Sequence, residues 1–135
     1  MGSGRPVLTA RTMRAVLDSN ILIDHLRGLG AAGTEIARYA PAVISPITWI
    51  EVMAGASEDV ERAALRTFLA SFELAPWTRP IMERAALLRN ETRLRLPDAI
   101  VLATALCDDL ILVTRNTKDF DPRIWPNIRV PYDVR

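Results

Sequence analysis

Short aliphatic segments alternate with helix-forming segments from residue 16 onward, and this alternation limits the fold more than any other feature of the chain. The segments with the composition of strands are 16–17, 42–44 and 110–114, with 74–75 as a further candidate. Short strands that are apolar throughout and separated by helices are typical of parallel sheets covered on both faces. We therefore predict an α/β fold, a three-layer α/β/α sandwich with a short, mainly parallel central sheet.

The segments between these strands carry the start and stop signals of helices. Ser45 precedes Pro46, a pair typical of a helix start because the hydroxyl caps the first turn and the ring fixes a helical φ. Gly28 is expected to end the first helix, and Pro97 to separate the last two. Residues 98–106 are apolar on every side, which predicts a buried helix. The predicted helices are 19–27, 34–39, 46–54, 58–72, 80–95 and 98–106.

Size and composition favour one domain. The chain has 135 residues, of which 50% are hydrophobic, enough for one core with little left for a second. We predict a single domain over residues 13–135, and a flexible leader, native or added for expression, over residues 1–12. No segment approaches the roughly 20 apolar residues of a membrane span, and the start lacks a signal peptide's apolar core. We expect a soluble, cytoplasmic protein that does not enter a membrane.

Charge and cysteine content narrow the chemistry. The formal net charge is +1, and Lys118 is the one lysine among 17 cationic side chains. The many arginines could bind phosphate, or they could simply form solvated helix faces. Cys107 is the single cysteine and follows an apolar run, so we expect a buried, unreactive thiol and no redox chemistry.

Two aspartates stand at the ends of predicted elements. Asp18 follows the first predicted strand, which places it at the carboxyl edge of the sheet, where open α/β folds bind ligands. Asp98 opens the apolar helix just after Pro97. Each aspartate alone is also consistent with a helix cap, and Ser19 or Asn20 could cap the helix after Asp18. Both aspartates are therefore candidate site residues.

Glu51 lies within an apolar helical stripe, four residues after Ile47 and three before Ala54. Burying an ionised glutamate alone costs several kcal/mol, so Glu51 needs a cation or a polar cavity nearby. The alternative is a helix rotated so that Glu51 faces water. A third group of acids, Asp119 and Asp121, flanks Phe120 in a loop after the last strong strand, where solvated turn aspartates are common.

Together these acids form an oxygen-rich set with no second cysteine or histidine to bind a softer metal, which suits Mg²⁺ or Mn²⁺. Hydrolysis of a phosphodiester is a reaction that such metals can support, because one or two divalent ions activate the attacking water and neutralise the negative charge that develops. Arg115 and Lys118 are candidates to steady phosphates. His25 is the only histidine, so a histidine-pair mechanism is excluded, and we expect His25 at the surface or in a supporting position.

Four segments carry a family resemblance as an ordered set. The segments are AVLDSNILIDHLRG, SPITWIEVMAG, LPDAIVLATAL and LILVTRNTKDF, which begin at residues 15, 45, 96 and 110. In order and spacing they resemble the motifs of PIN-domain ribonucleases, and most of all the toxin subunits of bacterial VapBC-type toxin–antitoxin pairs. The resemblance extends from about residue 13 to the end of the chain and implies a PIN-like fold.

The resemblance also implies roles for particular residues. Asp18, Glu51 and Asp98 match the three acids of the family's metal site. Where many relatives have a fourth acid, this chain has Asn116, and it offers Asp119 three residues later. The resemblance leaves open whether Asp119 or Asn116, through its amide oxygen or a water, completes the site. The residues that match positions supporting the site are Asn20, Asp24 and Thr114, and Arg115 is a further supporting candidate because of its charge.

The implied function is that of a Mg²⁺- or Mn²⁺-dependent endoribonuclease that hydrolyses RNA as a toxin and so inhibits translation and growth. The implied partners are an RNA substrate, a cognate antitoxin protein and a second copy of the chain in a homodimer. Two alternatives remain at this stage. Asn116 favours a non-catalytic PIN-like module that binds RNA or protein, whereas Lys118 could serve a flavodoxin-like pocket in which Asp18 accepts phosphate.

Overall fold

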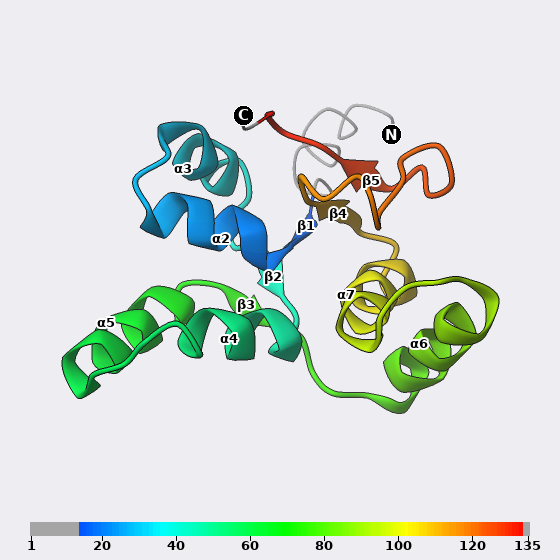
Figure 1. The fold of residues 1–135 in the computed structure, drawn as a ribbon, viewed down its shortest axis with the longest axis horizontal. Helices are drawn as coiled ribbons and strands as arrows, with labels where there is room; N and C mark the ends of the chain where they lie inside the picture. The colour runs from blue at the N-terminus through cyan, green and yellow to red at the C-terminus, as the bar shows by residue number, and fades with distance from the viewer. Residues whose placement is uncertain (1–13, 134–135) are drawn as a thin grey trace, which may run out of the picture.

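The computed structural model describes residues 14–133, which form five strands and six helices (Figure 1). The strands are β1 (Ala15–Leu17), β2 (Val43–Ile44), β3 (Glu73–Leu74), β4 (Ile111–Val113) and β5 (Ile128–Arg129). The helices are α2 (Ser19–Leu26), α3 (Gly30–Ala37), α4 (Pro46–Met53), α5 (Asp59–Leu69), α6 (Arg79–Glu91) and α7 (Leu96–Cys107). The predicted leader, residues 1–12, lies outside the described residues.

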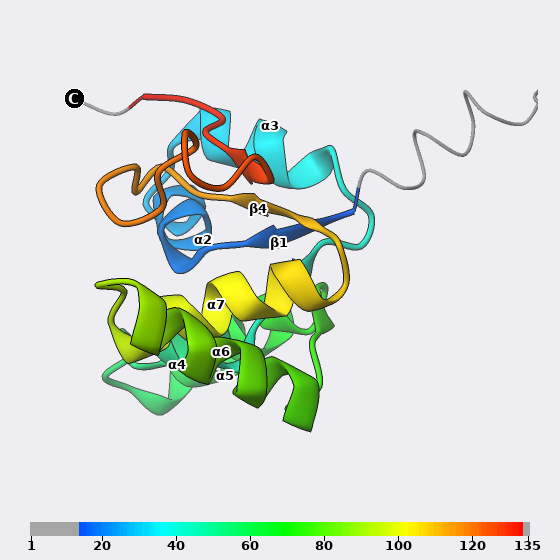
Figure 2. The same ribbon diagram turned by 90° about the vertical axis from the view of Figure 1, so that its right-hand side faces the viewer.

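The sheet has the order β3-β2-β1-β4-β5, and every pairing is parallel. Successive side chains of a strand point to opposite faces of a sheet. Val16 and Leu112 accordingly join one buried cluster with α6 and α7, while Leu17 and Val113 join the other with α2 and α4. Figure 1 shows β1 and β4 between α2 and α3 on the left and α7 and α6 on the right, and Figure 2 shows α7 below β1 and β4. The predicted α/β fold with a short parallel sheet is confirmed.

The predicted helices are all present, with shifted ends. Ser45 caps α4, accepting from the Ile47 amide at 3.1 Å, as its sequence predicts. α6 ends at Glu91, four residues before the predicted end, because the backbone becomes extended at Thr92, whose hydroxyl accepts from the Leu94 amide at 3.1 Å. α3 begins at Gly30, earlier than predicted. α7 begins at Leu96, so Pro97 lies in its first turn and does not separate it from α6.

One expectation about an individual residue is wrong, and one strand was not predicted. Cys107 is exposed, because it is the last residue of α7 and lies beyond the buried part of that helix. Its thiol donates to the Pro80 carbonyl at 3.5 Å. The strand β5 was not predicted, because it has two residues and only Ile128 in it is buried. Within residues 14–133, no helix combines the length and the apolar character that crossing a bilayer requires.

An ion pair joins α3 to β5. Glu35 is buried, and its carboxylate accepts from the Arg129 guanidinium at 2.7 and 3.0 Å and from the Tyr39 hydroxyl at 2.8 Å. Burial acts to raise the pKa of Glu35, but the bonds from Arg129 and Tyr39 hold that pKa below its ordinary value. The pair therefore fixes the edge strand that the sequence pattern did not reveal.

Candidate active site

The candidate site begins where two neighbouring strands end. β1 and β4 pair in parallel with Leu17 opposite Val113, so the residues that follow them, Asp18 and Thr114, are neighbours at the carboxyl edge of the sheet. The Asp18 amide donates to the Val113 carbonyl at 3.0 Å, and the Thr114 hydroxyl donates to the Asp18 carboxylate at 2.8 Å. Parallel pairing thus brings together two residues that are 96 positions apart.

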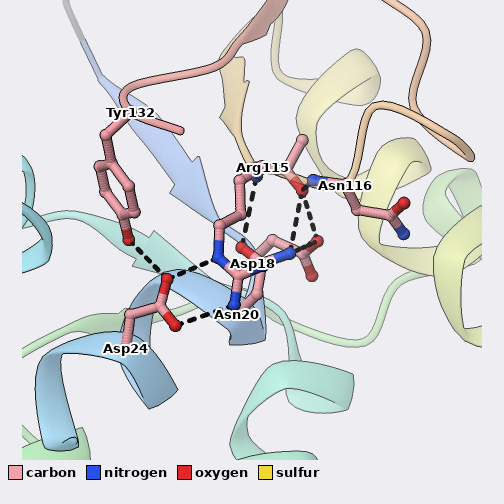
Figure 3. Close-up of polar contacts among 7 residues, drawn as sticks. Asp18, Asn20, Asp24, Arg115, Asn116 and Tyr132 are labelled. Carbon is pink, nitrogen blue, oxygen red and sulfur yellow. Dashed lines mark hydrogen bonds and ion pairs between the residues drawn. The ribbon is translucent and has the colours of Figure 1, made fainter. Parts of the chain in front are cut away.

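Asp18 is 6% exposed and is held by three donors (Figure 3). Besides Thr114, the Ser19 amide donates at 2.8 Å and the Asn20 side-chain amide at 3.2 Å. Asp18 is therefore itself the cap of α2, which is one of the roles considered for it, and Ser19 and Asn20 are not the cap. Burial raises the pKa of Asp18 to about 6; the hydrogen bonds lower it, and the charges of Asp98 and Glu51 raise it further. The carboxylate is oriented and poorly compensated by positive charge.

Asp98 lies in the first turn of α7 and faces the same edge. It makes no helix-capping hydrogen bond, and its nearest cation is the Arg95 guanidinium, 3.9 Å away. Burial raises the pKa of Asp98, the charges of Asp119 and Glu51 raise it as well, and Arg95 lowers it. The charges of two other carboxylates, Glu51 of α4 and Asp119 of the loop after β4, therefore act on Asp98 of α7. These three elements bring their acids to the same edge of the sheet.

Glu51 reaches the site for a different reason from the one predicted. The side chain is exposed, because α4 buries Thr48 and Val52 instead. The predicted stripe through Ile47 is thus wrong for Glu51, and its burial does not explain its presence. Its charge nevertheless raises the pKa of both Asp18 and Asp98, so the Glu51 side chain lies over the same sheet edge.

Asn116 and Asp119 are adjacent and bonded to each other. The Asn116 side-chain amide donates to the Asp119 carboxylate at 3.0 Å, and the Asp119 backbone amide donates to the Asn116 side-chain oxygen at 3.3 Å. The Asn116 backbone amide in turn donates to the Thr114 hydroxyl at 3.0 Å. Asn116 therefore orients Asp119, and of the two only Asp119 adds negative charge beside Asp98.

A second hydrogen-bond network, made by Asp24, Arg115 and Tyr132, lies next to Asp18 and Asn20 (Figure 3). The Arg115 guanidinium donates to the Asp24 carboxylate at 2.6 and 2.9 Å, and the Tyr132 hydroxyl donates to it at 2.9 Å. The pKa of Asp24 is lowered, chiefly by Arg115. The Arg115 amide also donates to the Asn20 side-chain oxygen at 3.4 Å. The Arg115 guanidinium is thus bound to Asp24, whereas the sequence made it a candidate to bind phosphate.

The sequence prediction missed Tyr132, which lies 108 residues after Asp24. Nothing in the local sequence pairs a tyrosine near the end of the chain with an aspartate in α2. His25 is exposed, as expected. Among the described residues, no three histidine, cysteine, aspartate or glutamate side chains are grouped closely enough to hold a metal ion between them. The site is a group of carboxylates spread around a common space.

Comparison with known proteins identifies the family. A family model described as the PIN domain matches residues 15–122. Ribonuclease VapC10 of Mycobacterium tuberculosis is 32% identical over 88% of this chain and 93% of its own length, and Ribonuclease VapC19 is 29% identical over 87% and 98%.

Solved structures agree with the family match. A chain in a toxin–antitoxin complex from Klebsiella pneumoniae is 42% identical, with a TM-score of 0.82 over 89% of this chain and 99% of its own. A chain of DNA-bound VapBC from Salmonella typhimurium, at 21% identity and a TM-score of 0.72, shares the fold. The chain with the Asp18, Glu51, Asp98 and Asp119 carboxylates at its sheet edge therefore belongs to the PIN-domain family and, within it, to the VapC proteins.

Proposed function

We propose that this protein is a Mg²⁺- or Mn²⁺-dependent endoribonuclease, the toxin of a VapBC-type toxin–antitoxin pair, which hydrolyses RNA and so inhibits translation and growth. The observation that carries the proposal is the group of acids at one sheet edge, where the charges of Asp98 and Glu51 act on Asp18 and those of Asp119 and Glu51 act on Asp98. The names of the relatives, ribonucleases VapC10 and VapC19, support RNA as the substrate.

The chemistry of the donor set fits a hard divalent cation. All four charged groups are carboxylates, and negative charges held near one another are stabilised by a cation between them. Mg²⁺ usually keeps several waters and binds through one or two carboxylates together with substrate phosphate, so it does not need the group of three protein ligands that the described residues lack. Asp18, Asp98 and Glu51 would hold the ion with Asp119, and Asn116 would act by orienting Asp119.

Each residue has a part that follows from its surroundings. Asp18 is fixed by Thr114, Asn20 and the Ser19 amide, so it supplies a rigid anchor. When bound, the divalent ion would activate water and neutralise the charge that develops on the phosphate. Glu51 is the most exposed of the four acids, which makes it the group best able to pass a proton from the attacking water to solvent.

Two partner surfaces are part of the proposal. A groove of about 520 Å³ between α2, α4 and α5 is lined by Ile23, Leu26, Val52 and Leu65, and Glu51 lies on its wall. An antitoxin segment in this apolar groove would end at the acids. A smaller apolar hollow between α6 and α7 has exposed Trp77, Met82 and Leu96 around it, and we assign it as the surface for a homodimer.

The test compares wild type with Asp98→Asn, both expressed from an inducible promoter in a bacterial host. We expect growth arrest and RNA cleavage from wild type alone, and cleavage by purified protein that EDTA stops and Mg²⁺ or Mn²⁺ restores. Asp108→Asn is the matched control, because Asp108 is exposed just beyond the other end of α7. Equal, harmless behaviour of wild type and Asp98→Asn would refute the proposal, and RNA binding without cleavage would favour a binding module.

A further inference from the structure

A second cleft, of about 430 Å³, lies beside the carboxylates, between the turn that follows α6 and the loop that follows β4. Arg93 and Leu94 line one side, and Lys118, Asp119 and Trp125 line the other. Asp119 belongs both to this cleft and to the candidate active site, since its charge acts on Asp98. A ligand in the cleft would therefore contact the edge of the proposed catalytic centre.

The cleft carries two cations that are available to a ligand. Arg93 and Lys118 are exposed, and neither makes a hydrogen bond or ion pair with any residue in the 14–133 range. Of the acids that line the cleft, Asp121 is paired with the Arg123 guanidinium at 2.9 Å, which leaves Asp119 and the exposed Glu91. Two unpaired cations next to a carboxylate site suit a polyanion that must approach those carboxylates.

The cleft also has an aromatic wall. Trp125 is half-buried, packs against the core cluster beneath α7 and is held by a 3.0 Å bond from its amide to the Asp121 carbonyl. Leu94 is buried opposite. A fixed aromatic ring beside unpaired cations is the combination with which proteins bind single-stranded nucleic acid, the base against the ring and the phosphates on the cations. A base must leave its stack to enter a cleft closed on two sides.

We propose that this cleft binds a nucleotide of single-stranded RNA adjacent to the scissile phosphate. Trp125 contacts the base, and Arg93 and Lys118 contact the flanking phosphates. The inference rests on the proposed ribonuclease function and adds the place where the substrate strand is held. It makes Arg93, Lys118 and Trp125 substrate-binding residues, separate from the acids that hold the metal.

The first test removes the two cations. Arg93→Gln/Lys118→Gln is compared with Arg66→Gln/Arg84→Gln, which removes two exposed arginines from α5 and α6 and so changes the net charge equally. Both pairs are placed in Asp98→Asn protein, and binding of a fluorescent single-stranded RNA is measured across a salt series. Losing two phosphate contacts should lower the slope of log Kd against log salt by about 1.4. The Arg66/Arg84 pair should leave the slope unchanged.

The second test locates the base. A short RNA carrying 5-iodouridine is bound to Asp98→Asn protein and irradiated, and the tryptic digest is analysed by mass spectrometry. We expect the crosslink in the peptide from Ile124 to Arg129, which contains Trp125 and can be distinguished from the peptides of Trp49 and Trp77. Trp125→Phe, which keeps an aromatic ring, should retain binding, whereas Trp125→Leu should weaken it at least about five-fold.

The outcomes separate this inference from the function on which it rests. If wild type cleaves RNA and the Arg93/Lys118 pair binds with the same Kd and salt slope as the control pair, the cleft is not the substrate site although the protein is a ribonuclease. A crosslink confined to other peptides would overturn the inference in the same way. If wild type neither binds nor cleaves RNA, the proposed function itself is wrong.

Discussion

Because Asp18 is buried, its charge should affect the stability of the metal-free protein in a way that can be tested. Asp18→Asn should stabilise the metal-free protein at neutral pH, although it removes a residue of the proposed active site. The pKa of Asp18 rises from an ordinary 3.8 to about 6, chiefly because the charged carboxylate is buried. That difference corresponds to about 3 kcal/mol of free energy of unfolding that wild type loses when Asp18 is ionised.

The replacement has a cost that reduces this gain. In the Asp18→Asn variant the new side-chain oxygen could still accept from the Ser19 amide, but the new NH₂ group would face the Asn20 side-chain amide and the Thr114 hydroxyl, which both lose their acceptor. Each such loss costs about 1 kcal/mol. The net expectation is a variant more stable by about 1 kcal/mol at pH 7.5, or roughly 3–4 °C in Tm for a domain of this size.

The sign of the pH dependence provides the check. A carboxyl group whose pKa is higher in the folded state binds a proton more tightly when folded, so its contribution is full below about pH 4 and is lost as pH rises through about 6. The advantage of Asp18→Asn should therefore vanish as the pH falls and become a deficit of up to about 2 kcal/mol near pH 4.

Urea denaturation in EDTA, followed by circular dichroism from pH 4 to pH 8, measures both limits. Asp108→Asn, which changes an exposed acid, should stay within about 0.5 kcal/mol of wild type. An Asp18→Asn protein that is less stable than wild type at pH 7.5, or a difference that does not change with pH, would refute the electrostatic reasoning.

Two further substitutions test the networks around the site. Thr114→Val removes the hydroxyl that donates to Asp18 and accepts from the Asn116 amide. We expect the free energy of unfolding in urea to fall by about 2 kcal/mol and RNA cleavage to fall at least about ten-fold. Unchanged cleavage would contradict the positioning role of Thr114. Arg129→Met should lower the free energy of unfolding by about 2–3 kcal/mol at pH 7, less than for a fully buried pair because the Arg129 side chain is 36% exposed. This loss should become smaller as falling pH protonates Glu35. A loss that does not change with pH would instead indicate lost packing.

The sequence was sufficient to predict the features that depend on interactions between neighbouring residues. Ser45 and Pro46 started a helix where predicted, because a capping hydroxyl and a fixed φ act on neighbouring atoms. The strand before Asp18 was identified by its apolar residues, and the buried helix α7 by the absence of a polar face. Helix ends were less accurate, since a helix such as α6 ends where one residue, here Thr92, takes an extended conformation that the apolar pattern does not reveal.

The orientation of α4 shows where local information stopped. Ile47, Trp49, Ile50 and Val52 place apolar side chains on several sides of a short helix, so the sequence alone did not determine which side faces the core. Packing against α2, α5 and α7 selected Thr48 and Val52 and turned Glu51 outward. The prediction that Glu51 belongs to the site agrees with its charge acting on Asp18 and Asp98, while the burial argument for it was wrong.

The sequence by itself determined the strand and helix pattern, and with it the position of Asp18 and Asp98 at the ends of elements. Parallel pairing of β1 with β4 then placed Thr114 on Asp18, and this register is a property of the whole sheet. Only the tertiary structure decided that Arg115 is engaged with Asp24 and that Tyr132 joins them. Contacts between residues about a hundred positions apart depend on the packing of the entire chain, which short-range patterns do not encode.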